Sequence, residues 1–151
     1  MSPKRGASLI CEGQIKIPYS WPAGKLGSHF LATLRDRMQL LGLRCPSCEK
    51  VLVPPTRCLS CDRVGTEWVQ VGPQGVLEVW TVVRTPISSI QVLPVPYAVG
   101  VICLDGADTG LVHLLGDVDF NKLRNGVRVE PVYNPNRRGH LLDIRYFRPI
   151  E

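Results

Sequence analysis

The amino-acid sequence predicts a mainly β protein, with an N-terminal arm and a short helix, a small cysteine ribbon, and a C-terminal barrel of five strands. Four cysteines stand in two Cys-x-x-Cys pairs that nine residues separate. From residue 64 onward, runs of β-branched and aromatic residues alternate with Gly/Pro clusters, which is typical of short strands joined by turns. No long helical pattern stands between these runs, so a parallel βαβ arrangement is not expected.

Residues 1–26 are predicted to form an irregular arm. The segment holds Tyr19, Trp21 and Pro22 in an otherwise polar stretch that also contains glycine. Aromatic side chains in an arm usually dock on the protein's own body or on a partner. We therefore expect Tyr19 and Trp21 to take part in docking.

Residues 27–40 are predicted to contain a short helix that ends near Gly42. Ser28 is the predicted N-cap, because its hydroxyl can accept a backbone N–H of the first turn. Phe30 and Leu34 lie at helical spacing and are expected to pack on the body, since a helix this short is not stable alone. The leucine-rich stretch that follows is expected to form a strand leading into the ribbon.

Residues 41–64 are predicted to form a ribbon around one metal ion. Cys45 with Cys48, and Cys58 with Cys61, each bracket a tight turn, so the four sulfurs can face one point. A ribbon of about 25 residues buries little apolar area, and metal binding would supply the missing folding energy. Four thiolates leave no open coordination position, so we expect one structural Zn²⁺ per chain. Iron in a tetrahedral S4 site and a thiol/disulfide switch are the chemical alternatives.

The residue after the second cysteine of each turn departs from a common pattern. Many such turns place glycine there, where φ is often positive, whereas this chain has Glu49 and Asp62. Aspartate tolerates a positive φ better than glutamate does. We expect modest strain or a different turn at Glu49.

Residues 65–151 are predicted to form the barrel. Strands are expected at residues 68–71, 76–83, 97–104, 110–115, 127–133 and 141–147, with one helical turn over 119–124. Closing the strands into a barrel removes exposed sheet edges. The five-stranded oligonucleotide/oligosaccharide-binding (OB) barrel is the best match in size.

Charge is distributed unevenly along the chain. Residues 1–62 have nine Lys and Arg against four Asp and Glu, whereas residues 63–151 have nine of each. A basic half favours an anionic partner, such as nucleic acid, a phosphate-bearing cofactor or an acidic protein face. A solvated surface that keeps the protein soluble is the alternative.

The sequence contains no apolar stretch of about 20 residues, so no membrane span is expected. Its N-terminus lacks the apolar run of a signal peptide, which predicts residence in the cytoplasm. In that reducing compartment, paired Cys-x-x-Cys turns indicate a metal site more often than a disulfide.

Catalytic motifs of the G-x-S-x-G, G-x-x-x-x-G-K and G-x-G-x-x-G types are missing. The three histidines, His29, His113 and His140, stand far apart and are expected to be structural or solvent-facing. Cys103 is expected to be a small core residue, although a Cys103–His113 pair across a hairpin is conceivable. The sequence does not predict catalysis by this chain alone.

At several segments the chain resembles the DUF35 family. The aromatic arm is matched by Y-S-W-P-A-G at residues 19–24, and the helix by H-F-L-A-T-L at residues 29–34. The most specific match is residues 41–61, which contain both cysteine turns with Val53-Pro54-Pro55 between them. Glu49 and Asp62 are the departures noted above.

The resemblance implies a rubredoxin-like zinc ribbon joined to an OB-fold barrel, in a protein associated with acyl-CoA enzymes. Members of the family typically lack catalytic residues and form complexes with thiolases, thiolase-like aldolases or hydroxymethylglutaryl-CoA synthases. They bridge or complete the partner and help to shape the acyl-CoA channel. At this length, the chain is similar to the small subunit of a two-component thiolase.

A docking surface for a thiolase-like catalytic subunit is expected on the arm, at Tyr19 and Trp21, and on the segment Val51 to Pro55. Basic side chains of the helix and ribbon are expected to meet an acidic partner face or the phosphates of a coenzyme A thioester. They are Arg35, Arg37, Arg44, Lys50, Arg57 and Arg63.

Two other functions remain open at this point. A single-stranded nucleic-acid-binding module is compatible with a pI near 9.0. However, the barrel half has no net charge, whereas a groove that tracks a nucleic-acid strand needs basic residues. A rubredoxin-like electron carrier is the third possibility, and it requires iron.

Overall fold

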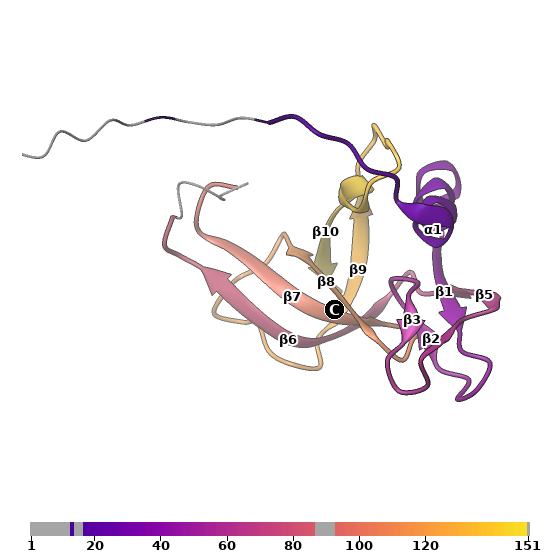
Figure 1. Ribbon diagram of the computed structural model, residues 1–151. Coiled ribbons are helices and arrows are strands. Elements are labelled where there is room, and N and C mark those ends of the chain that lie inside the picture. The colour runs from indigo at the N-terminus through magenta and orange to yellow at the C-terminus, as the bar shows by residue number, and fades with distance from the viewer. Residues whose placement is uncertain (1–12, 14–16, 87–92, 151) are drawn as a thin grey trace, which may run out of the picture.

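The computed structural model describes residues 13, 17–86 and 93–150. The N-terminal part consists of α1 (Gly24–Arg37), β1 (Leu40–Arg44), β2 (Val51–Leu52), β3 (Arg57–Cys58), β4 (Arg63–Val64) and β5 (Glu67–Val71). The C-terminal part consists of β6 (Gly75–Val83), β7 (Tyr97–Leu104), β8 (Gly110–Leu115), β9 (Arg128–Tyr133), the 3₁₀ helix η1 (Leu141–Asp143) and β10 (Ile144–Pro149). In Figure 1, α1 and the short strands lie on one side of the longer barrel strands.

Five strands close into a barrel in the order β10-β8-β7-β6-β9. The pairs β6–β7 and β7–β8 are antiparallel, whereas β10 meets β8 in parallel at Phe147 and Leu115. A closed barrel of five strands is the OB architecture. The predicted mainly β fold with a C-terminal five-stranded barrel is therefore confirmed.

Alternation along the strands places the barrel core. In β7, the even-numbered residues point inward and are buried, among them Ala98, Ile102 and Leu104, and the odd-numbered residues are partly exposed. Glycine suits position 100 of the same strand, because a Cβ there would collide with the buried side chain of Leu77. A register shift in β6 just after Leu77 lets that strand bend around the core.

The ribbon strands form a separate small sheet with the order β2-β1-β5, and β3 pairs with β4 as a hairpin. The sequence predicts that the barrel starts at residue 65, so β5 was expected to belong to it. Instead, β5 pairs with β1 of the ribbon sheet, from Leu40↔Val71 to Arg44↔Glu67. A single apolar core joins Phe30 of α1 to barrel residues such as Phe147. The ribbon therefore lies against the barrel.

Helix α1 differs at both ends from the expected one. It begins at Gly24 after an Ala23 cap that makes no side-chain hydrogen bond, so the prediction of Ser28 as N-cap was wrong. Gly24 has a φ of 71°, which glycine adopts without a Cβ clash, and this allows the helix to start earlier. The helix ends at Arg37, because Met38 takes a left-handed conformation and donates its N–H to the carbonyl oxygen of Leu34.

The predicted helical turn at 119–124 is only a hydrogen-bonded turn, in which the N–H of Lys122 donates to the carbonyl oxygen of Asp119 over 2.9 Å. No helix among the described residues is long and apolar enough to cross a membrane.

Candidate metal centre and docking surface

The four cysteines meet at the end of the ribbon. Cys45 follows β1, Cys48 precedes β2, and Cys58 and Cys61 bracket the turn after β3. All four Sγ atoms lie within 4.8 Å of one another, and those of Cys48 and Cys58 are 3.7 Å apart. Zn–S bonds of about 2.3 Å give a regular tetrahedron whose S–S edges are roughly 3.8 Å. The cluster therefore has the size and donor set of a four-thiolate metal site.

Two matching turns position these sulfurs. The N–H of Glu49 donates to the carbonyl oxygen of Cys45 over 2.9 Å, and the N–H of Asp62 donates to that of Cys58 over 2.8 Å. Both residues adopt a positive φ, 62° at Glu49 and 51° at Asp62. Arg57 supports the second turn by donating to the backbone carbonyl and to the carboxylate of Asp62. The sequence predicts either modest strain or a different turn at Glu49. The structure has the same turn as at Asp62, with a strained, positive φ at Glu49.

Replacing Glu49 with glycine is expected to raise the free energy of unfolding by about 1 kcal/mol, because glycine adopts a positive φ without a Cβ clash. The hydrogen bond to Cys45 involves only the backbone and is retained. Chemical denaturation of the metal-loaded protein measures the change. Glu49→Ala is the matched control, and since it keeps the Cβ it is expected to stay near the wild type. A glycine variant no more stable than the alanine variant would contradict this account of the turn.

The thiols influence one another electrostatically. Backbone N–H groups of Ser47 and Cys48 lower the pKa of Cys45 to about 7. A hydrogen bond to Cys48, together with burial, raises the pKa of Cys61 to about 12. The Cys45 thiolate is thus favoured, whereas ionisation of Cys61 is opposed by its hydrogen bonding within the cluster and by burial. A bound dication removes this opposition, because a coordinating thiol is deprotonated outright.

The site is closed. Cys45 and Cys58 are buried with Leu52, and Cys48 and Cys61 pack against them. Four protein sulfurs fill a tetrahedral coordination sphere, so a metal here would have no position for substrate. The cluster can therefore hold the ribbon together but cannot act as a Lewis acid.

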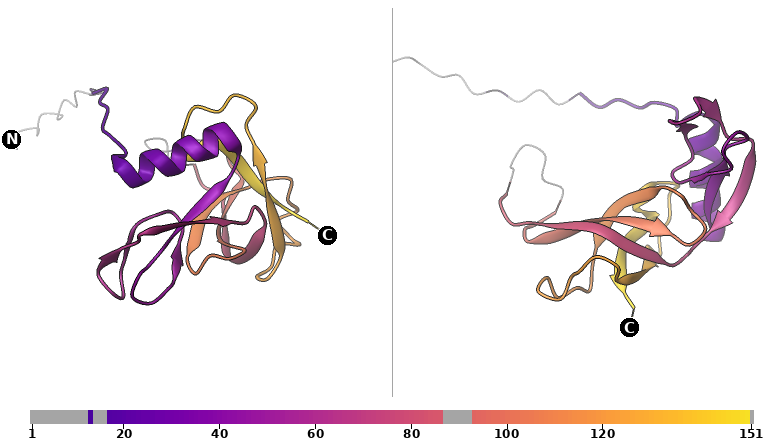
Figure 2. Two further views of the ribbon diagram at one scale, coloured as in Figure 1. Left: turned by 90° about the vertical axis from the view of Figure 1, so that its right-hand side faces the viewer. Right: turned by 90° about the horizontal axis from the view of Figure 1, so that it is seen from below.

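The predicted docking aromatics lie away from the cysteines. Tyr19 and Trp21 are 77% and 71% exposed, and their rings stack on each other with centroids 5.1 Å apart. Figure 2 shows residues 17–23 leading away from α1 without crossing the barrel. Among the described residues, the arm therefore does not dock on the protein's own body.

Most of the segment Val51 to Pro55 cannot serve as a docking surface, because Val51, Leu52 and Val53 are buried, whereas Pro54 is exposed and Pro55 is half-buried. The N–H of Val51 donates to the carboxylate of Asp108 over 2.8 Å, and the N–H of Val53 donates to the hydroxyl of Thr109 over 2.7 Å. These bonds fasten the ribbon to the loop between β7 and β8.

Residues 68–134 match the family model described as the C-terminal OB-fold domain of ChsH2. The solved structure named Ltp2-ChsH2(DUF35) aldolase contains a similar chain, with a TM-score of 0.60 and 22% sequence identity. The alignment covers 85% of this chain and 98% of that one. The chain therefore has the fold of the DUF35 chain in that structure.

A second DUF35 structure, a protein of unknown function from Sulfolobus solfataricus, is similar with a TM-score of 0.58 and 17% identity. That alignment covers 72% of this chain and 78% of the other. Both structural matches show that this chain shares their fold.

The six basic residues expected to bind a partner or coenzyme A differ in whether they form ion pairs. Three are in ion pairs on the surface: Arg35 with Asp36, Arg44 with Glu67, and Arg57 with Asp62. Arg37, Lys50 and Arg63 are exposed and have no ion pair within the described part of the chain. Exposed pairs contribute little to stability, so the paired arginines can exchange partners.

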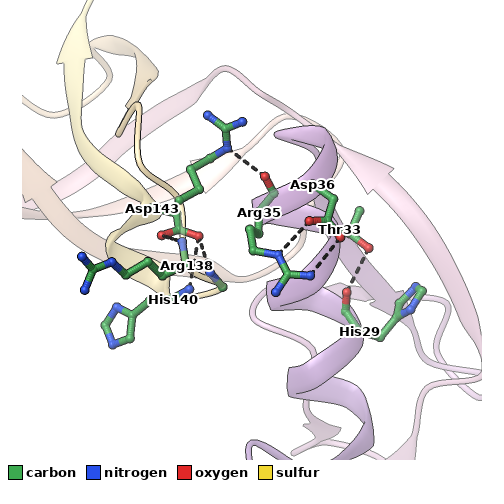
Figure 3. A network of polar contacts seen from close by, with 9 residues as sticks. His29, Thr33, Arg35, Asp36, Arg138, His140 and Asp143 are labelled. Atoms are coloured by element: carbon green, nitrogen blue, oxygen red, sulfur yellow. Dashed lines mark hydrogen bonds and ion pairs between the residues drawn. The ribbon is translucent and has the colours of Figure 1, made fainter.

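A polar network beside α1 was not foreseen from the sequence (Figure 3). The buried carboxylate of Asp143 accepts hydrogen bonds from the backbone N–H groups of Arg138, Gly139 and His140. The neighbouring Arg137 donates from Nε to the carbonyl oxygen of Arg35 over 2.8 Å. Arg137, from the charge-neutral half, thus lies near the C-terminal end of α1. Only the tertiary fold brings it there, and no local motif could have indicated it.

The three histidines have separate, structural surroundings. His29 contacts Trp68 with the two rings tilted by 52° and their centroids 4.5 Å apart, and His140 caps η1 by accepting the N–H of Leu142. His113 is 4% exposed and lies in the barrel against Phe147. Register excludes a Cys103–His113 pair, since Cys103 is opposite Gly110 and His113 is opposite Gly100.

The free energy of unfolding is expected to fall as the pH is lowered, because of the buried His113. Burial lowers the pKa of His113, partly offset by hydrogen bonding to the backbone of Leu141, so the folded protein holds it neutral. The unfolded chain binds the proton below about pH 6.5, and stability is lost as the pH falls from there toward the lower folded pKa. Unfolding free energies measured at pH 7.5 and 5.5 should show this loss.

His113→Gln is the control, because glutamine can still donate to Leu141 but does not titrate. The cysteine cluster titrates equally in both proteins. The difference between their losses of unfolding free energy therefore measures the contribution of His113. An identical loss in both proteins would contradict the assignment.

Proposed function

We propose that this chain is a non-catalytic, zinc-binding small subunit of a thiolase-type acyl-CoA complex, required for assembly and activity. The four-sulfur cluster, closed and matched in size to a tetrahedral ion, supports the proposal most strongly. Cys45, Cys48, Cys58 and Cys61 would hold one structural Zn²⁺, which supplies a cross-link to the ribbon. The chain's own task is then to present surfaces to a partner.

A partner subunit is supported by a relative and by the surface. The similar chain from the Ltp2-ChsH2(DUF35) aldolase is named together with a second protein. Several large apolar side chains of this chain are open to solvent, including Trp21 and, at 98% exposure, Leu59 beside the second cysteine turn. Exposed apolar groups of this kind are typical of interfaces. The proposed partner is a thiolase-like catalytic subunit, in a cytoplasmic hetero-oligomer.

A contribution to the acyl-CoA channel is the finer part of the proposal. Arg37, Lys50 and Arg63 are the best candidates to meet an acidic partner face or coenzyme A phosphates, since their charges are not already paired among the described residues. The small subunit of the benzoylsuccinyl-CoA thiolase of anaerobic toluene degradation is one protein that the chain resembles. Its acyl-CoA is therefore the first substrate to test.

Co-expression with the thiolase-like subunit tests the proposal. We expect the two proteins to elute together with one zinc per small subunit, and thiolysis to require both. A small subunit that elutes alone, together with thiolase activity that its removal leaves unchanged, would reject the proposal.

The outer face of the barrel argues against the nucleic-acid alternative. Val79, Val101 and Val112 lie in one cross-strand row on β6, β7 and β8, and they line a shallow apolar groove of about 150 Å³. A strand-tracking groove needs basic residues with the aromatics. Titration with a single-stranded oligonucleotide is expected to show no salt-sensitive binding.

A further inference from the structure

In the arm before α1, large apolar side chains alternate regularly with other residues. Ile17, Tyr19 and Trp21 occupy every second position and are 71%, 77% and 71% exposed. The stacked rings of Tyr19 and Trp21 place these two side chains together. Side chains two apart share a face in an extended chain. Residues 17–21 thus form an apolar face that contacts no other described element.

The two backbone edges of this segment differ in their hydrogen-bonding capacity. In an extended chain the N–H and C=O groups of successive residues point to alternate edges. Pro18 and Pro22 have no N–H, so one edge retains only the donor of Ser20. The opposite edge keeps the N–H groups of Ile17, Tyr19 and Trp21. Proline is confined to sheet edges for this reason, and the segment can pair on one side only.

The segment has no sheet edge to join in its own barrel, because the five strands close on themselves. It also contains no charged residue between Ile17 and Gly24, so its side chains offer a partner no ion pair and its largest side chains are aromatic. A strand that pairs on one edge and is apolar on one face fits addition to a sheet edge that borders an apolar pocket.

We propose that residues 17–21 add as an edge strand to a β-sheet of the thiolase-like catalytic subunit, with Tyr19 and Trp21 in an apolar pocket beside that edge. This inference rests on the proposed function, which names the partner but not the mode of docking. The backbone N–H and C=O groups of Ile17, Tyr19 and Trp21 would form the hydrogen bonds with the partner strand. The rings of Tyr19 and Trp21 would anchor the segment in the pocket.

Titration of zinc-loaded variants against the purified catalytic subunit tests both parts. Tyr19→Ala and Trp21→Ala are each expected to weaken binding about 30-fold, the usual effect of truncating an aromatic anchor. Tyr19→Pro is expected to weaken binding about fivefold more than Tyr19→Ala, because it also removes an N–H from the pairing edge. Ser20→Pro is the matched control. It removes an N–H from the other edge and should bind within about twofold of wild type.

Two results would overturn the strand addition while leaving the proposed function intact. One is wild-type affinity in both alanine variants, and the other is equal weakening by Ser20→Pro and Tyr19→Pro. A wild-type chain that does not bind the catalytic subunit rejects the proposed function, and the inference with it. A homodimer that Trp21→Ala dissociates assigns the arm to a second copy and also overturns the proposal.

Discussion

Replacing Cys45 with serine is expected to abolish metal binding and to unfold the ribbon. Cys45 is fully buried, and its loss leaves three thiolates around the ion. Structural zinc supplies on the order of 10 kcal/mol to small metal-dependent folds, so the loss should exceed about 4 kcal/mol. For a protein of this size, that lowers the melting temperature by roughly 10 °C or more. Elemental analysis and calorimetry measure the two effects.

Cys103→Ser is the matched control, since Cys103 lies outside the cluster and donates to the carbonyl oxygen of Ala107. Serine retains a donor there, and metal content should be unchanged. A Cys45→Ser protein with full metal content and the wild-type melting temperature would show that the cluster does not hold the ribbon.

Asp143→Asn is expected to lower the free energy of unfolding by about 2 kcal/mol, the usual magnitude for hydrogen bonds to a buried charged group. The carboxylate is 3% exposed and accepts three backbone N–H groups at 2.9, 2.7 and 3.2 Å. An asparagine at position 143 has an NH₂ group in place of one carboxylate oxygen. This group would face backbone N–H donors from which it cannot accept hydrogen bonds. Chemical denaturation at pH 7 measures the loss.

The difference should depend on pH in a defined direction. Burial by itself raises the pKa of Asp143, but hydrogen bonds from the backbone of Arg138, Gly139 and His140 outweigh it and lower the pKa. The stabilisation is therefore fully present above the unfolded value of about 3.9 and is lost as the pH falls through the folded pKa. The gap between wild type and variant should narrow below about pH 4.

Asp119→Asn provides the control for this prediction. Asp119 accepts a single backbone N–H, from Asn121, in an exposed turn. Its substitution should change stability by less than about 0.5 kcal/mol. If both variants lose the same small amount, Asp143 does not anchor the loop.

Local patterns were sufficient for the features that depend on neighbours in sequence. The spacing of Cys45, Cys48, Cys58 and Cys61 predicts their convergence, because each pair closes its own turn. Alternation predicts β6 to β9, since one face of each strand must be buried. The positive φ expected after each cysteine pair is also present, at Glu49 and Asp62.

Features that depend on distant contacts were not predictable in the same way. Gly24 begins α1 where Ser28 was expected to cap it, because glycine can turn the chain without a side-chain bond. Val51 and Val53 look like a free apolar segment until Asp108 and Thr109, more than fifty residues later, bond to their backbone. The role of Asp143 likewise depends on a loop whose conformation has no motif.

Native mass spectrometry of the wild-type chain, purified without added metal, tests the central claim most directly. We predict one zinc ion on every folded chain, with the four cluster cysteines protected from alkylation. A folded chain that carries no metal and whose four thiols react freely would contradict the account.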